Sequence, residues 1–257
     1  MNAQRVTLDQ FEGLRAVPTS RHYQPMNLFA PTPEVDWVVR NVVVGGEATL
    51  LVAEGGIGKS FFALALSLSV AGGEAFLDEP VQQSRVLYVD EEGSPALALQ
   101  RLQQLGATTA QRENIDYLNF QNVDMVRRPG ELIEDVQSSG ARLVVLDSFS
   151  KIARAADENS NDAMSRVWDE GVLKLARSTN AAVLVIHHTN GYGGSRGASQ
   201  IRNSADQVLT MRKQEDRSQI IYPSKPRRKT HRIHFNFRKS PLGLVYLAPV
   251  YDYEEWK

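Results

Sequence analysis

The chain has 257 residues, a length that suits one α/β domain with a sizeable core and is short for two. Its hydrophobic content of 42% and charged content of 23% are ordinary for a globular protein, and the absence of cysteine excludes disulfides and thiolate metal sites. No apolar run approaches the roughly 18 residues of a membrane span, and the first residues lack the apolar core of a signal peptide, so we expect a cytoplasmic protein with no membrane partner. The formal net charge of −1 argues against a chain that coats DNA by bulk charge.

Residues 1–39 contain several prolines and no sustained apolar periodicity. Proline interrupts both helices and sheets, so this stretch predicts an arm or linker and not a folded domain. We place the folded domain at residues 40–257.

From residue 42 onward, apolar runs alternate with helical patterns. Strands are expected at residues 48–52, 85–89, 115–120, 143–146 and 182–186. Helices are expected between them, at residues 60–71, 95–105, 130–138 and 162–178. This alternation predicts an α/β fold with a mostly parallel sheet covered on both faces. Later short strands, at residues 207–212, 219–222, 231–237 and 244–248, predict an antiparallel extension of the same sheet.

The most informative stretch is residues 53–60, AEGGIGKS, which lies between the first core strand and a helix start. It fits the phosphate-loop pattern G-x-x-x-x-G-K-[ST] except at the first position, where Ala53 is a tolerated variant. The glycines let backbone N–H groups point at phosphate oxygens beside the positive end of the helix dipole. Lys59 would neutralise the β- and γ-phosphates of ATP, and the Ser60 hydroxyl would ligate Mg²⁺. The nucleotide-binding residues are then Glu54, Gly55, Gly56, Ile57, Gly58, Lys59, Ser60 and Phe61.

Carboxylates follow two of the predicted strands. Asp147 ends the apolar run of residues 143–146, which is where ligands bind in open α/β sheets, and together with the phosphate loop it fits a Walker B residue that holds Mg²⁺. Asp90, Glu91 and Glu92 end the strand of residues 85–89 and suit a general base that orients water. The alternative is a solvated acidic turn that caps the next helix, and spacing alone does not decide which of the three acts.

His187 and His188 end the strand of residues 182–186 and precede a glycine-rich loop, residues 191–197. A polar group at that strand end can sense the γ-phosphate, and a mobile loop with Tyr192, Ser195 and Arg196 suits contact with single-stranded DNA. A plain surface loop is the alternative for the loop, and a metal site is a weaker alternative for the two histidines because no third ligand lies near them in the sequence.

A basic run extends from residue 225 to residue 239, with seven Lys or Arg, two His and no acidic residue. Such a run is typical of an anion-facing surface, for the phosphates of ATP or of nucleic acid, or simply of a solvated face.

Taken together, these motifs resemble the RecA-like hexameric ATPases, and most of all the plasmid RepA-type replicative helicases, which are AAA-family ATPases of phages, plasmids and mobile elements. The resemblance covers roughly residues 35–250. It aligns Glu92 with the catalytic glutamate of that family, with Glu91 in reserve, and Arg101 with an arginine of the following helix. His188 matches the sensor position, and Arg196 matches the Ser-Arg-Gly loop.

The resemblance implies a RecA-like ATPase domain at residues 40–257 and a homo-oligomeric ring, usually a hexamer, with ATP and Mg²⁺ between subunits. Residues 1–39 would then pack on a neighbouring subunit. The chain departs from the RepA-type pattern at Leu209, where that group carries an arginine finger. Lys225 and Arg227 are similar to the Lys-x-Arg finger of DnaB- and KaiC-type rings, which implies that they act on the ATP of the neighbour.

Two functions are therefore expected. The first is a helicase or translocase that uses ATP to move along single-stranded DNA during replication. The second is a DNA-dependent or regulatory ATPase, such as a recombination mediator or a switch, without unwinding activity. The first is the preferred interpretation, whereas the near-neutral charge and the lack of a separate DNA-binding domain are the features that speak for the second.

Overall fold

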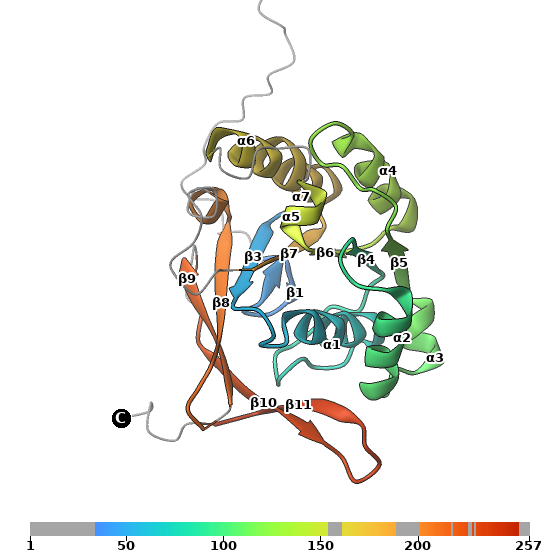
Figure 1. Cartoon of the computed structure of the whole chain (residues 1–257), viewed down its shortest axis with the longest axis vertical. Helices are drawn as coiled ribbons and strands as arrows, with labels where there is room; N and C mark the ends of the chain where they lie inside the picture. The colour runs from blue at the N-terminus through green and yellow to red at the C-terminus, as the bar shows by residue number, and fades with distance from the viewer. Residues whose placement is uncertain are drawn as a thin grey trace, which may run out of the picture. The chain divides into compact units, whose positions relative to one another are not determined.

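The computed structural model describes residues 34–153, 161–188, 201–216, 218–225, 228 and 230–251. Its centre is a nine-stranded sheet with the order β11-β10-β9-β8-β3-β7-β6-β4-β5 (Figure 1). The parallel strands are β3 (Ala48–Ala53), β4 (Val86–Asp90), β5 (Ile115–Asn119), β6 (Leu143–Asp147), β7 (Ala182–His188) and β8 (Gln207–Lys213). The antiparallel strands are β9 (Gln219–Lys225), β10 (Ile233–Lys239) and β11 (Val245–Pro249).

The predicted α/β class, a mostly parallel sheet with an antiparallel extension, is confirmed, with one difference in strand direction. We expected residues 207–212 to begin the antiparallel extension, but β8 pairs parallel with β3, from Thr49 opposite Gln207 to Val52 opposite Thr210. The extension therefore begins at β9. The largest shift of a strand end is also in β9, which continues to Lys225 instead of ending at residue 222.

Helices cover the sheet from two sides, as Figure 1 shows. On one side lie α1 (Lys59–Gly72), α2 (Pro95–Gln104) and α3 (Thr109–Glu113). On the other lie α4 (Pro129–Ser139), α5 (Phe149–Ile152), α6 (Asn161–Arg166) and α7 (Lys174–Thr179). Alternate residues of one strand enter different cores: Leu50 joins the core under α4 to α7, and Leu51 the core under α1. Because both faces are buried, the central strands are apolar throughout.

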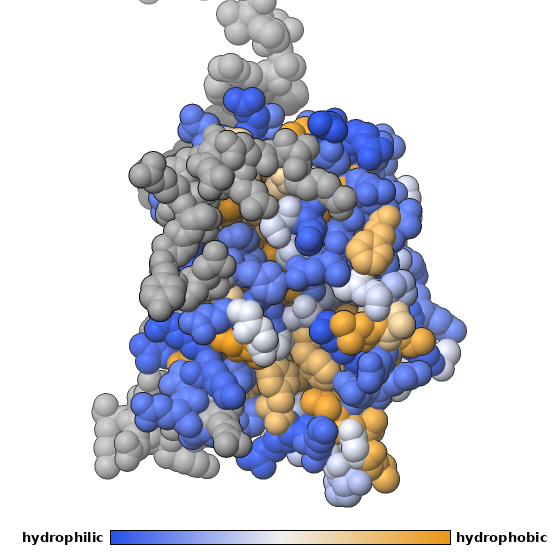
Figure 2. Space-filling view, in the orientation of Figure 1, coloured by the Kyte–Doolittle hydropathy of each residue, from blue (hydrophilic) through white to orange (hydrophobic). Residues whose placement is uncertain are grey.

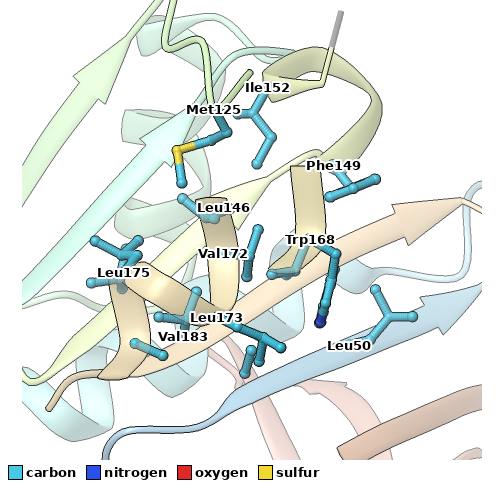
Figure 3. Close-up of a cluster of buried hydrophobic side chains, with 14 of the residues drawn as sticks. Leu50, Met125, Leu146, Phe149, Ile152, Trp168, Val172, Leu173, Leu175 and Val183 are labelled. Carbon is cyan, nitrogen blue, oxygen red and sulfur yellow. The ribbon is translucent and has the colours of Figure 1, made fainter. Parts of the chain in front are cut away.

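The expected helix of residues 162–178 contains an irregularity. Residues Val167–Leu173 form a π-helical segment between α6 and α7. Trp168 lies in this segment, is fully buried, and packs against Phe149 with ring centroids 5.7 Å apart (Figure 3). A Cβ on Gly171 would lie 3.0 Å from the carbonyl oxygen of Met125, so the glycine permits close approach of the two backbones.

Some elements were not predicted. The short helices α3 and α5 were missed, as was the hairpin of β1 (Trp37–Val39) and β2 (Val43–Val44). Val38 and Val39 join the apolar core beneath α1, and the compact unit begins at Val35, so residues 37–39 pack with this body. Within the described ranges, no helix combines the length and the apolar character that crossing a lipid bilayer requires.

Candidate nucleotide-binding site

The phosphate loop connects β3 to α1, in the strand–turn–helix context that the sequence predicts. Gly58 immediately precedes α1 with φ of 104°, a conformation that residues with a Cβ rarely adopt. A Cβ at this position would also lie 2.9 Å from Cε2 of Phe237 in β10. Phe237 in turn meets the ring of Phe61 edge-to-face at 5.7 Å. The antiparallel extension therefore packs against the phosphate loop through Phe237.

The Lys59 ammonium is held against the loop backbone. Its Nζ donates to the carbonyl oxygens of Ala53 and Glu54, both at 2.8 Å, and the residue is only 3% exposed. Burial lowers the pKa of Lys59, and the nearby carboxylates of Asp147 and Glu92 partly offset that effect. A phosphate group could take the place of the carbonyl contacts and would restore the charge balance of the buried ammonium.

Asp147 ends β6 and is 4% exposed. Burial raises the pKa of its carboxyl, whereas hydrogen bonds with Ser60 and from Tyr88 oppose the rise; the Tyr88 hydroxyl donates to Oδ2 at 3.1 Å. A carboxylate beside a hydroxyl at a phosphate loop is the donor set that Mg²⁺ takes in phosphate sites, where few protein ligands suffice. The residues present therefore fit Mg²⁺, and the structure brings the predicted pair together. Among the described residues no cluster of three His, Asp or Glu forms a fuller metal site.

The three acidic residues after β4 have different surroundings. Asp90 accepts hydrogen bonds from the N–H groups of Glu92 (3.1 Å) and Gly93 (2.6 Å), so it shapes the turn. Glu91 is 3% exposed and accepts from the N–H of Val123 at 3.3 Å. Of the two glutamates, Glu92 lines the cavity beside Lys59 and Glu91 does not.

Two contacts fix the Glu92 carboxylate. Ser148, which follows Asp147 through a cis peptide bond, donates its hydroxyl to Oε2 at 2.7 Å, and Nε2 of His188 lies 3.4 Å from Oε1. Partial burial would raise the pKa of Glu92, but the Ser148 hydrogen bond and the His188 imidazole outweigh it and lower the pKa. The carboxylate is therefore ready to accept a proton only if it first loses these contacts or shares them.

The two histidines at the end of β7 point to different environments, as neighbours in a strand do. His188 contacts Glu92, whereas His187 is largely buried and meets Phe149 edge-to-face at 6.0 Å. Burial lowers the pKa of His187 to about 4. This separation argues against a metal shared by the two rings.

These groups surround one cavity of about 400 Å³ at the carboxyl ends of β3, β4 and β6. It is lined by Gly56, Gly58, Lys59, Ser60, Phe61, Asp90, Glu92, Gly93, Leu97, Arg101, Asp147 and His188. Of the remaining loop residues, Glu54 and Gly55 are exposed and Ile57 packs against the core. Leu97 and Gly93 carried no signal in the sequence, and Arg101 was signalled only by the family resemblance.

Other predicted site residues lie elsewhere. Lys225 ends β9, pairs with Val208 and does not line the cavity; its Nζ donates to the carbonyl oxygens of Asn203 and Ala205, the latter at 2.8 Å. Arg227 and the loop residues Tyr192, Ser195 and Arg196 fall outside the described residues.

Part of the basic run faces the protein's own carboxylates and not an external anion. Arg228 binds Glu47 through both terminal guanidinium nitrogens, one of them at 2.6 Å, and His231 Nε2 lies 2.7 Å from Oε1 of Glu79. The expectation of an anion-facing surface is therefore wrong for these two positions. Sequence reasoning missed the partners because Glu47 and Glu79 precede the run by a long stretch of chain.

The comparisons with known proteins agree with this geometry. A protein-family profile described as an AAA domain matches residues 17–193. Among solved structures, the fold is similar to that of a KaiC-like protein from the hyperthermophilic archaeon Pyrococcus horikoshii OT3, with a TM-score of 0.59 and 14% identity over 82% of this chain and 94% of that one. The profile covers more than half of the chain, and the sheet and phosphate loop have the arrangement of a RecA-like P-loop fold. The chain belongs to the AAA domain family.

Proposed function

We propose that this protein is an ATP-hydrolysing, ring-forming motor of the RepA-like replicative helicase type, which translocates on single-stranded DNA. One observation carries the proposal: the Glu92 carboxylate lies in the cavity with Lys59 and Asp147 and contacts His188. His188 ends β7 directly before residues 189–200, which contain the expected DNA-contacting residues. Catalytic and DNA-binding groups would thus be neighbours along the chain.

The residues of the cavity divide the work of hydrolysis. Lys59 and the loop N–H groups would bind the β- and γ-phosphates of ATP, and Ser60 and Asp147 would hold Mg²⁺, which supplies positive charge to the phosphate oxygens. Glu92 would orient a water molecule and accept its proton as the water oxygen attacks the γ-phosphorus and ADP leaves. Arg101, which also lines the cavity, adds positive charge on the side of α2.

The position of Lys225 favours action on a neighbouring subunit. β9 runs antiparallel to β8, so Lys225 pairs with Val208, which in turn pairs with Leu50. That row lies three residues before the end of β3, about 10 Å of strand from the phosphate loop. The next described residue, Arg228, pairs with Glu47, which precedes β3 and so lies farther from the loop. Arg227 would therefore reach ATP on another copy and not on its own, as a finger in a ring requires.

His188 would couple the two activities. Its imidazole Nε2 lies 3.4 Å from Oε1 of Glu92. A bound γ-phosphate offers the imidazole a competing partner, and a change of partner at the end of β7 would alter the start of the segment that carries Tyr192 and Arg196. In the ring, hydrolysis at successive interfaces would move these loops along the DNA.

The second candidate is a regulatory or DNA-dependent ATPase that forms a ring or filament without unwinding duplexes. A specific observation favours it: the basic run is partly neutralised within the subunit, because the Arg228 guanidinium pairs with Glu47. Fewer cations then remain for phosphate contacts, which lowers the expected affinity for DNA.

The first test measures ATP turnover of the purified protein with and without single-stranded DNA, with Lys59→Ala as the inactive control. Several-fold stimulation that Arg196→Ala removes would support the motor, and strand displacement on a forked duplex would separate it from the regulatory ATPase. Turnover that is indifferent to DNA would refute the motor. In a ring confirmed by light scattering, full activity of Arg227→Ala would refute the trans-acting finger.

A further inference from the structure

Two tyrosines lie directly beneath the candidate catalytic carboxylates. Tyr88 in β4 and Tyr117 in β5 are register partners, and their rings are stacked with centroids 6.0 Å apart and an interplanar angle of 29°. Tyr88 is 1% exposed, and Tyr117 is partly buried against the core beneath α1. Neither residue belongs to the set that lines the nucleotide cavity. Their hydroxyls nevertheless reach towards it.

The Tyr88 hydroxyl is directed at the carboxylate assigned to Mg²⁺. It donates to Oδ2 of Asp147 at 3.1 Å, and the Ser60 hydroxyl hydrogen-bonds the same side chain. A buried carboxylate with only one donor could rotate about its terminal torsion, which is broad for aspartate. The second donor limits that rotation, because the Tyr88 ring is itself fixed by its burial and by stacking on Tyr117.

The Tyr117 hydroxyl acts on the other half of the site. It donates to Oδ2 of Asp90 at 2.8 Å, while Oδ1 of Asp90 accepts the N–H groups of Glu92 and Gly93. Asn119, two residues farther along β5, donates to the carbonyl oxygens of Asp90 at 2.7 Å and Gly93 at 2.8 Å. Residues of the edge strand β5 therefore hydrogen-bond Asp90 and Gly93, which lie before and after Glu92 in the chain.

We propose that Tyr88 and Tyr117 are a stacked pair of positioning residues, in which Tyr88 orients Asp147 for Mg²⁺ and Tyr117 orients the turn of Glu92 through Asp90. The inference rests on the proposed hydrolysis of ATP at this site. Because the rings stack on each other, the pair fixes the metal carboxylate and the base relative to one rigid element of the sheet. Its two halves make separable predictions, since each tyrosine contacts a different carboxylate.

Tyr88→Phe tests the metal half, because it removes the hydroxyl and keeps the ring. The affinity for a fluorescent, non-hydrolysable ATP analogue is measured with Mg²⁺ and with EDTA. We expect affinity in EDTA to stay within about two-fold of the unchanged protein, and the gain in affinity on adding Mg²⁺ to shrink by about ten-fold, the usual cost of removing a partner of a metal ligand. An undiminished gain in the variant would overturn the assignment of Tyr88.

Tyr117→Phe tests the base half. We expect kcat for ATP to fall by about ten-fold, with an unchanged Mg²⁺ gain in analogue binding and an unchanged KM for ATP. Hydrogen exchange of the backbone amides of residues 92 and 93 should become faster. Unchanged exchange together with unchanged kcat would overturn this half.

Tyr222→Phe is the matched control, because its ring lies in β9 against the Arg212 guanidinium, away from the cavity. A merely structural role for the two tyrosines would lower the melting temperature without separating Mg²⁺ binding from kcat, and that outcome would refute the proposal. Failure of the underlying function looks different: the unchanged protein would then show no Mg²⁺ gain in analogue binding and no ATP turnover.

Discussion

Glu92 and Glu91 are adjacent in the sequence, but replacing each by glutamine should affect ATP turnover very differently. Glu92→Gln removes the proposed general base, and removing such a group costs about 10²- to 10⁴-fold in rate. That loss corresponds to about 2.7–5.4 kcal/mol of transition-state stabilisation, at 1.36 kcal/mol for each ten-fold. The glutamine keeps an oxygen that can accept the Ser148 hydroxyl, so the side chain should stay in place and nucleotide affinity should change by less than about three-fold.

Glu91→Gln provides the matched control. The Glu91 side chain is buried and accepts the N–H of Val123, an interaction that a glutamine oxygen preserves. We expect turnover within about two-fold of the unchanged protein and a loss of about 1 kcal/mol of stability, the scale of one weakened hydrogen bond.

Steady-state phosphate release at saturating ATP, together with equilibrium binding of a fluorescent nucleotide, distinguishes the two variants. The reasoning would fail if Glu91→Gln lost as much turnover as Glu92→Gln, or if Glu92→Gln kept more than about a tenth of it. Melting temperatures of both variants control for misfolding. A loss of nucleotide binding in Glu92→Gln would also count against the assignment, because a base that only orients water contributes little to ground-state affinity.

Other outcomes follow from particular contacts. Trp168→Ala should cost about 3–5 kcal/mol in urea unfolding, because it empties a fully buried site between the π-helical segment and the sheet; a loss below 1 kcal/mol would contradict its central place in the core. Gly58→Ala should weaken nucleotide binding and lower the melting temperature, and the double variant with Phe237→Ala should recover part of the stability by relieving the 2.9 Å contact; no recovery would show that the positive φ alone sets the cost. Because burial lowers the pKa of Lys59, ATP binding to the free protein should weaken with rising pH before an ordinary lysine would lose its proton, and binding should take up protons in alkaline buffer; calorimetry in buffers of different ionisation enthalpy would show neither effect if the lysine were unperturbed.

The sequence predicts the core well for a physical reason. Each central strand is buried on both faces, so its residues are continuously apolar and stand out against the amphipathic helices. The direction of β8 could not be predicted in this way, because it depends on which end of the sheet the preceding chain returns to. The π segment around Trp168 was equally hidden, since helical periodicity does not separate one helical hydrogen-bonding pattern from another.

The site, too, has residues that the sequence predicts and residues that it does not. Lys59, Asp147 and Glu92 were predicted to meet because the carboxyl ends of parallel strands converge at one edge of the sheet. Tyr88 and Tyr117 read as ordinary strand residues, and only the register of β4 with β5 reveals that their hydroxyls serve two carboxylates. A tyrosine that supports a site from within a strand carries no local sequence signal, because tyrosine is also common in strands for its packing alone.

The charge of the chain bears on how DNA would be held. A basic run in isolation predicts many phosphate contacts, yet Arg228 and His231 already face carboxylates of their own subunit. The Arg228 guanidinium, engaged in this way, releases fewer counterions on binding DNA and adds less to the affinity. A single chain with a net charge of −1 would therefore bind DNA weakly. In the proposed ring the same loop recurs in every subunit, and contacts that are weak singly act at high effective concentration once the strand is enclosed. Weak contacts that exchange one at a time are also what a motor needs, because a strand held tightly by any one subunit could not be passed to the next.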